Sequence, residues 1–295
     1  MKGPLFSILP RRAAGPLCFA LALAAVAPVA RADEAPDLST GWPAGWRRIG
    51  TEEGAAIGGL GTASILLQLF LNAPEQPHWD SPILFDDSVR NALRASSESG
   101  RSRADTFSNA AFVMAAYPVV VDAIFVTWLG RGQADAALQL ALIDAEAIAI
   151  TTIVTTTMQR AVGRARPFMR ECASNPNDPN CAGSANSRNS SFISGHASLA
   201  FTAAGALCVQ HSRLSLYGSA DWAVCPAALG IATGASLLRV VADKHWTTDV
   251  IAGAVVGGAV GAIVSAVHLR MGDGPPSSGI TLGGQGQSMI YWRQF

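Results

Sequence analysis

Six long apolar stretches dominate this sequence and limit the folds that are open to it. They are residues 55–71, 107–129, 134–157, 197–209, 223–241 and 250–267. None of them alternates apolar and polar residues as a half-exposed strand does, and most approach the roughly 20 residues that an α-helix needs to cross a bilayer. The sequence therefore predicts an all-α fold, a bundle of about six core helices embedded in a membrane.

The composition supports the same prediction. Charged residues make up 14% of the chain, against roughly 25% in an ordinary soluble domain. Lys and Arg together number 21 and so do Asp and Glu, so no overall basic field exists to attract nucleic acid. We expect a membrane to be a partner of this chain and nucleic acid not to be one.

Small residues recur in the last apolar stretch. Gly253, Gly257 and Gly261 follow one another at intervals of four residues. On a helix this spacing puts all three on one side, where the absence of side chains lets another helix backbone approach closely. We expect this helix to make a close contact with a neighbour in the bundle.

The first 32 residues have the pattern of a signal peptide. Lys2, Arg11 and Arg12 form a basic start, residues 17–27 are apolar, and residues 30–32 read Ala-Arg-Ala, the small-x-small pattern at which signal peptidase cuts. Cleavage there starts the mature chain outside the cytoplasm, and an uncleaved anchor helix is the alternative.

The remaining chain divides into one domain and a tail. Residues 33–271 are expected to form a single helical domain. Residues 272–295 are rich in Gly, Pro and Ser and predict a linker and tail with one strand at residues 288–292.

Four cysteines remain after removal of the leader. Cys172 and Cys181 bracket a polar stretch with two Pro-containing turns, and in an oxidising compartment we expect a disulfide that closes this loop. A metal pair is the alternative, although no second Cys or His pair lies at zinc-like spacing. This loop is expected to face the periplasm. Cys208 and Cys225 can pair as well if the bundle is a soluble periplasmic one.

The candidate chemistry lies in three polar clusters at the ends of apolar stretches. The first cluster is Gln159, Arg160, Arg164 and Arg166, before Pro167. Guanidinium groups crowded at one helix end repel one another unless an anion binds among them, and Arg presents forked donors that suit phosphate oxygens. The alternative is a basic cluster that flanks a membrane span.

The second cluster opens the fourth apolar stretch with Ser194, Gly195 and His196. A hydroxyl and an unobstructed backbone N–H at a helix N-terminus favour an anion. His196 can protonate whatever that anion is attached to. A helix cap with a bystander His is the alternative.

The third cluster is Arg239, His245 and Asp249. His245 and Asp249 are four residues apart, so on a helix both side chains point to one face. The carboxylate can then accept the imidazole N–H and leave the other ring nitrogen free as a nucleophile. An interfacial ion pair is the alternative.

Taken together, the clusters resemble the signature of the type 2 phosphatidic acid phosphatase (PAP2) superfamily, which includes bacterial acid phosphatases and vanadium haloperoxidases. That signature reads Lys-x6-Arg-Pro, then Pro-Ser-Gly-His, then Ser-Arg-x5-His-x3-Asp. All internal spacings are kept here, and the resemblance covers roughly residues 105–269. Gln159 stands at the Lys position, Ile193 at the Pro position and Leu238 at the Ser position.

The resemblance implies a phosphoric ester hydrolase that needs no metal and no cofactor. In it His245 is the nucleophile held by Asp249, and His196 is the general acid and base. Phosphate is bound by the remaining signature residues, with Arg160 and Arg164 as auxiliary cations that can make up for the neutral Gln159. The signature residues expected to bind phosphate are Gln159, Arg166, Ser194, Gly195 and Arg239.

We expect the substrates to be lipid phosphate monoesters or pyrophosphates, met at the periplasmic face of the inner membrane of a Gram-negative-type bacterium. For the three clusters to face the periplasm after export, one apolar stretch must not cross, and the shortest of the first three, residues 55–71, is our choice. The alternatives are a soluble periplasmic acid phosphatase, a vanadate-dependent haloperoxidase and a non-catalytic bundle that binds or transports lipid phosphate.

Overall fold

The computed structural model describes residues 35–36, 38–172, 174 and 180–270, and the backbone of two strands nearer the C-terminus. The predicted signal peptide lies outside the described residues. The long helices are α2 (Thr51–Phe70), α4 (Glu98–Val120), α5 (Ala134–Val162), α7 (Gly195–Arg213), α8 (Asp221–Val241) and α9 (Thr247–His268). The short ones are α3 (Asp86–Leu93) and α6 (Ala185–Arg188), and α4 runs on into the π-helix η1 (Val121–Gly130). The prediction of an all-helical bundle is confirmed.

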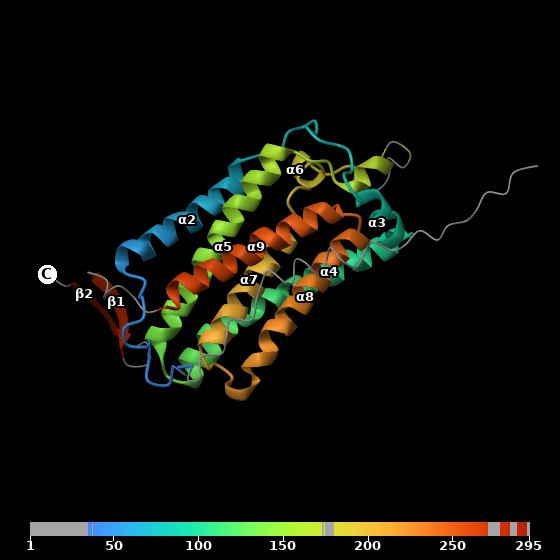
Figure 1. Ribbon diagram of the computed structural model, residues 1–295. Coiled ribbons are helices and arrows are strands. Elements are labelled where there is room, and N and C mark those ends of the chain that lie inside the picture. Colours follow the sequence, from blue (N-terminus) through green and yellow to red (C-terminus); the bar gives the residue numbers. More distant parts are fainter. Residues whose placement is uncertain are drawn as a thin grey trace, which may run out of the picture.

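The long helices lie along one common direction, with α3 and α6 at one end of the bundle and the strands at the other (Figure 1). Helix α7 is the central helix, because it packs against α9, α8, α5 and α4 and most of its residues are buried. Its buried face is made largely of Ala, Ser, Thr and Gly. Such small side chains allow several helices to surround one.

The closest packing in the bundle joins α7 to α9 through the glycines that the sequence singled out. A Cβ atom at Gly257 would lie 1.9 Å from the carbonyl oxygen of Ser198, and one at Gly261 would lie 2.0 Å from that of Thr202. The predicted close helix contact is therefore confirmed. It brings the first turns of α7 and α9 side by side, so that the backbone N–H of Ser194 donates to the carbonyl of Asp249 at 3.1 Å.

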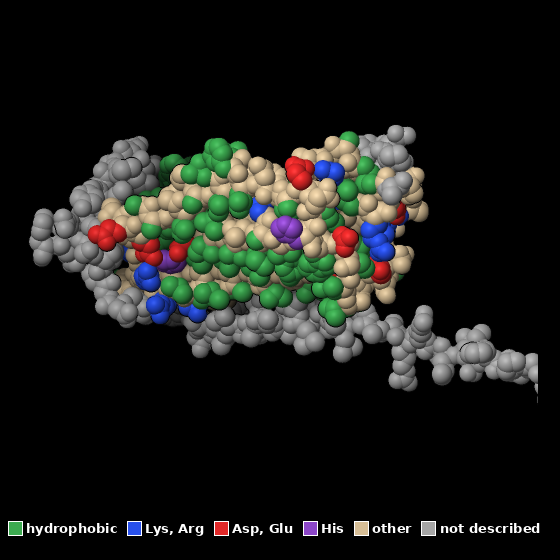
Figure 2. Space-filling view, turned by 90° about the horizontal axis from the view of Figure 1, so that it is seen from above, with side chains coloured by type: hydrophobic (Ala, Val, Ile, Leu, Met, Phe, Trp, Pro, Cys, Tyr) green, Lys and Arg blue, Asp and Glu red, His purple; other side chains and the backbone are tan. Residues whose placement is uncertain are grey.

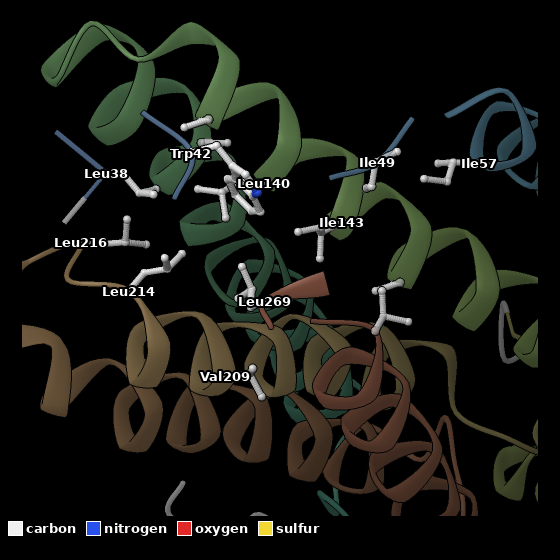
Figure 3. Close-up of a cluster of buried hydrophobic side chains, with 14 residues drawn as sticks. Leu38, Trp42, Ile49, Ile57, Leu140, Ile143, Val209, Leu214, Leu216 and Leu269 are labelled. Carbon is white, nitrogen blue, oxygen red and sulfur yellow. The ribbon is translucent and has the colours of Figure 1, made fainter. Parts of the chain in front are cut away.

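The segment before α2 closes the opposite end of the bundle. Leu38, Trp42 and Ile49 are buried there among apolar side chains of α5 and of the residues that follow α7 and α9 (Figure 3). Leu214 and Leu269 belong to the same cluster. The chain therefore enters the bundle at the end away from the first turns of α7 and α9.

Within the part of the chain that the structure describes, five helical segments are long and apolar enough to cross a membrane. They are Thr51–Phe70, Glu98–Gly130, Ala134–Val162, Gly218–Val241 and Thr247–His268. Figure 2 shows hydrophobic side chains over the middle of one long face, with charged ones gathered toward its two ends. Such a belt suits a lipid bilayer, so these five segments are candidate membrane spans.

The expectation that residues 55–71 do not cross is not supported. They belong to α2, which packs beside α5 and meets the criteria of length and composition. Its outward side chains are apolar and exposed, with Leu69 at 67% and Phe70 at 76%. The long helix that is not among the five candidate spans is the enclosed α7.

The tail holds two strands where one was expected. Strands β1 (Ser278–Gly283) and β2 (Ser288–Arg293) pair antiparallel. The second strand supplies the backbone partner that an isolated strand at residues 288–292 lacks.

Both cysteine pairs are joined. Cys172 is bonded to Cys181 in the loop that follows the first cluster. Cys208, near the end of α7, is bonded to Cys225, near the start of α8. The two disulfides thus lie toward opposite ends of the bundle.

Candidate active site

The three polar clusters meet at one end of the bundle. Helix α5 ends at Val162, and the left-handed backbone of the next residue, Gly163 (φ 57°), turns the chain across the bundle end. A Cβ atom there would lie 2.5 Å from the Pro74 side chain, so glycine suits this turn. The cluster that follows α5 then lies beside the N-termini of α7 and α9 and the C-terminus of α8.

His245 is held by a backbone carbonyl. Its Nδ1 lies 2.8 Å from the carbonyl oxygen of Ser191, an acceptor, so Nδ1 carries the proton and donates it. The Asp249 carboxylate, predicted to be this acceptor, lies 3.9 Å from Nδ1. The prediction of a direct bond is therefore wrong. Its chemical result stands, because Nε2 of the buried ring is left with a lone pair.

Asp249 instead fixes the loop that carries this carbonyl. It accepts the Ser191 hydroxyl at 2.5 Å, the Trp246 backbone N–H at 2.9 Å and the Arg164 guanidinium at 2.5 Å. These donors come from the segments before α7, before α9 and after α5. The fully buried carboxylate therefore joins all three polar clusters.

Arg164 belongs to this scaffold and not to the phosphate pocket. Its side chain is 0% exposed and pairs with both Asp249 and Asp86, the latter at 2.7 Å. The guanidinium also stacks on Trp79, 3.8 Å from the ring centre. Because two carboxylates already compensate its charge, Arg164 does not serve as the auxiliary phosphate ligand that the sequence predicted.

Arg166 and Arg239 line a cavity of about 320 Å³. The other residues around it are Asp105, Phe168, Asn180, Gly183, Ser187 and Lys244. The Nε atoms of both arginines are buried and have no hydrogen-bond partner among the described residues. Burial, together with the neighbouring Arg239 guanidinium, lowers the pKa of Arg166 to about 10. Two arginines that line one cavity are suited to an oxyanion, because guanidinium groups form strong hydrogen bonds to charged oxygens.

The same surroundings keep His245 neutral. Burial lowers the pKa of its ring well below the usual 6.5, and the guanidinium groups of Arg166 and Arg239 lower it further. A neutral imidazole with a free Nε2 is the form of His that attacks phosphorus.

The other residues of the first two clusters are not among those that line this cavity, and they meet at the loop before α7. Gln159 Nε2 donates to the carbonyl of Ile193 at 2.8 Å, and Arg160 donates to the Ser190 hydroxyl at 2.6 Å. Both therefore brace the loop before α7. Ser194 caps α7, and Gly195 is the first residue of that helix.

One helix contributes site residues that the motifs did not include. Helix α4 presents Asp105, Asn109 and Phe112, spaced i, i+4 and i+7 on one face. Asp105 pairs with Arg239, Asn109 Oδ1 lies 2.7 Å from His196 Nε2, and the Phe112 ring is centred 4.9 Å from that of His196. The polar spacing of Asp105 and Asn109 at the start of an apolar helix was the available signal.

A separate group could hold a metal ion. Glu53, Glu146 and His268 place ligand atoms within 4.8 Å of one another. Arg47 donates to Glu53 at 2.7 Å and His268 to Glu146 at 2.7 Å, so the carboxylates already have partners. His268 ends α9, about 30 Å along that helix from Asp249 at 1.5 Å per residue, so this group lies outside the site.

Comparison with known proteins agrees with the motifs. Residues 140–272, which contain all three clusters, match the family model of the PAP2 superfamily. A solved structure similar to the chain is the crystal structure of the first transmembrane PAP2 type phosphatidylglycerolphosphate phosphatase from Bacillus subtilis. The identity is 16% and the TM-score 0.41, over 69% of this chain and 94% of that one. No curated protein matches the chain significantly. The match to the PAP2 superfamily therefore covers the region that forms the site, a little less than half of the chain.

Proposed function

We propose that this protein hydrolyses lipid phosphate monoesters or pyrophosphates through a phosphohistidine on His245. The observation that carries the proposal is a buried, neutral His245 close to Arg166 and Arg239, two arginines that line a cavity and whose Nε atoms have no partner among the described residues. A phosphoryl group supplies the oxygens that these donors lack.

In the first step Nε2 of His245 attacks phosphorus while the bond from phosphorus to the leaving oxygen breaks, and His196 gives that oxygen its proton. In the second step His196 takes a proton from water, the water oxygen attacks phosphorus, and the N–P bond breaks to release phosphate. Arg166, Arg239 and the N-terminus of α7 hold the equatorial oxygens, whose charge must be stabilised during transfer. These fixed cations take the place that a metal holds in other phosphatases.

The position of the cavity supports a lipid substrate, and the neighbouring disulfide supports a periplasmic site. It lies at one end of a bundle whose long face is mainly apolar over its middle (Figure 2), which is where the headgroup of a lipid in the same membrane would lie. The Cys172–Cys181 disulfide is beside the site, since Asn180 lines the cavity. Disulfides persist in oxidising compartments, which favours the periplasm.

The test is phosphate release from a panel of lipid phosphates. The wild-type protein is expected to release phosphate in EDTA, to be inhibited by vanadate, and to form a phosphoenzyme that is stable in alkali and labile in acid. His245→Ala abolishes all three, whereas the matched control His78→Ala, in the loop after α2, retains them. Loss of activity in EDTA, or a phosphoenzyme in His245→Ala, overturns the proposal.

A soluble periplasmic acid phosphatase is the second candidate, and the Cys208–Cys225 disulfide favours it. This bond lies toward the end of the bundle away from the site, whereas Cys172–Cys181 lies beside the site. Both ends of the bundle therefore carry a disulfide, as expected if both ends lie in an oxidising compartment. The segment with Leu38 and Ile49 also packs at that far end. If all six long helices cross, residues 38–49 and the site lie on opposite sides of the membrane, which conflicts with export of residue 33 and a periplasmic site.

Fractionation separates the two candidates. A membrane enzyme remains in the membrane fraction after osmotic shock and is extracted by detergent, whereas release with the periplasmic proteins supports the soluble enzyme. In intact cells, an impermeant thiol reagent applied after mild reduction labels Cys172 and Cys181 if the site faces the periplasm. Labelling only after cell lysis contradicts that orientation.

A further inference from the structure

We propose that Asn109 of α4 is a positioning residue that orients His196 for proton transfer to the leaving group. This inference rests on the proposed function, because it assigns a partner to the general acid of that reaction. It adds a fourth segment, α4, to the three clusters that form the site.

The contact fixes the ring of His196 on two sides. Asn109 Oδ1 lies 2.7 Å from Nε2, so Nε2 carries a proton and donates it to the amide oxygen. The Phe112 ring, one turn further along α4, is centred 4.9 Å from the imidazole and inclined to it by 48°. With Nε2 engaged by Asn109, Nδ1 is the nitrogen left for the reaction.

The chemistry of the partner suits a proton donor. An amide oxygen is a neutral acceptor, so it orients the imidazole without holding the imidazolium as strongly as a carboxylate does. When His196 is protonated on both nitrogens, Nε2–H stays on Asn109 and Nδ1–H passes to the leaving oxygen. His196 is then neutral and ready to accept a proton from water in the second step.

The same helix face positions the phosphate-binding cation. Asp105, one turn before Asn109, pairs with Arg239. Arg239 and His196 must act on the same phosphoryl group, one on its equatorial oxygens and the other on the leaving oxygen. Helix α4 therefore sets the distance between the two.

The test uses the dependence on the leaving group, which a purely structural role would not change. Expulsion of an alkoxide from an alkyl or lipid phosphate needs a proton, whereas 4-nitrophenolate leaves without one. We expect Asn109→Leu, which is similar in shape but has no acceptor, to slow phosphoenzyme formation about 100-fold for the alkyl phosphate. With 4-nitrophenyl phosphate the expected loss is less than about threefold.

Two companion variants complete the experiment. Asn109→Asp keeps an oxygen in place and is expected to retain the alkyl reaction within about tenfold. Thr106→Val, on the same helix, removes a hydroxyl that donates to the Ser102 carbonyl of that helix; it is the control and leaves both reactions unchanged. The double variant His196→Ala with Asn109→Leu should be no slower than His196→Ala alone, because one function has been removed twice.

The outcomes separate this inference from the proposed function. Equal losses on both substrates in Asn109→Leu, or additive losses in the double variant, overturn the role of Asn109 and leave the phosphatase intact. Phosphoenzyme formation that persists in His245→Ala overturns the proposed function itself. If Asn109→Leu does not fold, the same comparison is made with Asn109→Ser.

Discussion

The carboxylate of Asp249 stands 3.9 Å from Nδ1 of His245, beyond hydrogen-bonding distance. The link between them passes through Ser191, whose hydroxyl binds the carboxylate and whose carbonyl accepts the imidazole proton. Asp249 therefore acts on the nucleophile by fixing a loop. It also compensates Arg164, which gives it a structural role that the motif alone does not indicate.

Replacement of Asp249 should accordingly destabilise the fold. In Asp249→Asn the fully buried Arg164 loses one of its two carboxylates, and breaking a buried pair of this kind costs about 3–5 kcal/mol. We expect a large drop in the free energy of unfolding, measured by thermal denaturation in detergent. Ser191→Ala is the comparison, since it removes one neutral donor and keeps the carbonyl that holds His245. A stable Asp249→Asn protein that lacks only activity would show that the carboxylate serves the nucleophile alone.

Gln159→Lys should tighten anion binding. Gln159 stands where the family signature has Lys, and its amide now donates to the Ile193 carbonyl. A cation at this position adds a charged hydrogen bond to the phosphoryl group, about 1.5–3 kcal/mol, or roughly 10- to 100-fold in affinity. Vanadate inhibition measures this directly, with Gln159→Met as the control for loss of the Ile193 contact. Unchanged inhibition would mean that Arg160 already supplies the charge.

Phosphoenzyme formation should persist in mild acid. Burial and two guanidinium groups keep the pKa of His245 well below 6.5, so the ring remains neutral and nucleophilic as the pH falls through that value. The rate of phosphoenzyme formation is measured against pH with two substrates whose phosphate groups ionise at different pH values. A fall in rate at low pH that is the same for both substrates belongs to the enzyme. Arg166→Gln removes one of the cations that lower the pKa of His245, so this fall in rate should move to higher pH. If the rate of phosphoenzyme formation by the wild-type enzyme already falls at or above pH 6.5, His245 is not held neutral and the prediction is contradicted.

Gly257→Ala should separate α7 from α9. The added Cβ would lie 1.9 Å from the Ser198 carbonyl, so the helices must move apart, at a cost of about 3 kcal/mol or more. Gly230→Ala is the matched control, because nothing lies within 4 Å of its added Cβ. It should stabilise α8 by up to about 1 kcal/mol. Equal unfolding temperatures for the two variants would exclude the close contact.

The sequence predicts well those parts of the site that depend on local spacing. Ser194 and Gly195 open a helix as expected, and the interval from Arg239 to His245 spans the turn between α8 and α9. The glycines at intervals of four around Gly257 predicted the helix contact, because their effect depends only on the absence of side chains. These features can be recognised within one segment of chain.

The parts that escaped prediction depend on which helix faces come together. Asn109 lies 87 residues before its partner His196, and Asp86 lies 78 residues before Arg164. Nothing in either local sequence states that these residues meet. The acceptor for His245 is a backbone carbonyl, which leaves no trace in the identity of residue 191. The prediction for Arg164 was wrong because an arginine near a phosphate motif looks the same whether it binds substrate or two buried carboxylates.

The glycine contact between α7 and α9 also bears on how such an enzyme can change its substrate. Because carbonyl oxygens of α7 lie against the glycines of α9, the two histidine-bearing segments are held at a fixed separation. New headgroups must therefore be accommodated on the opposite wall, by α4 and by the disulfide-closed loop near Asn180. Diversification can proceed there while the distance between nucleophile and proton donor stays the same.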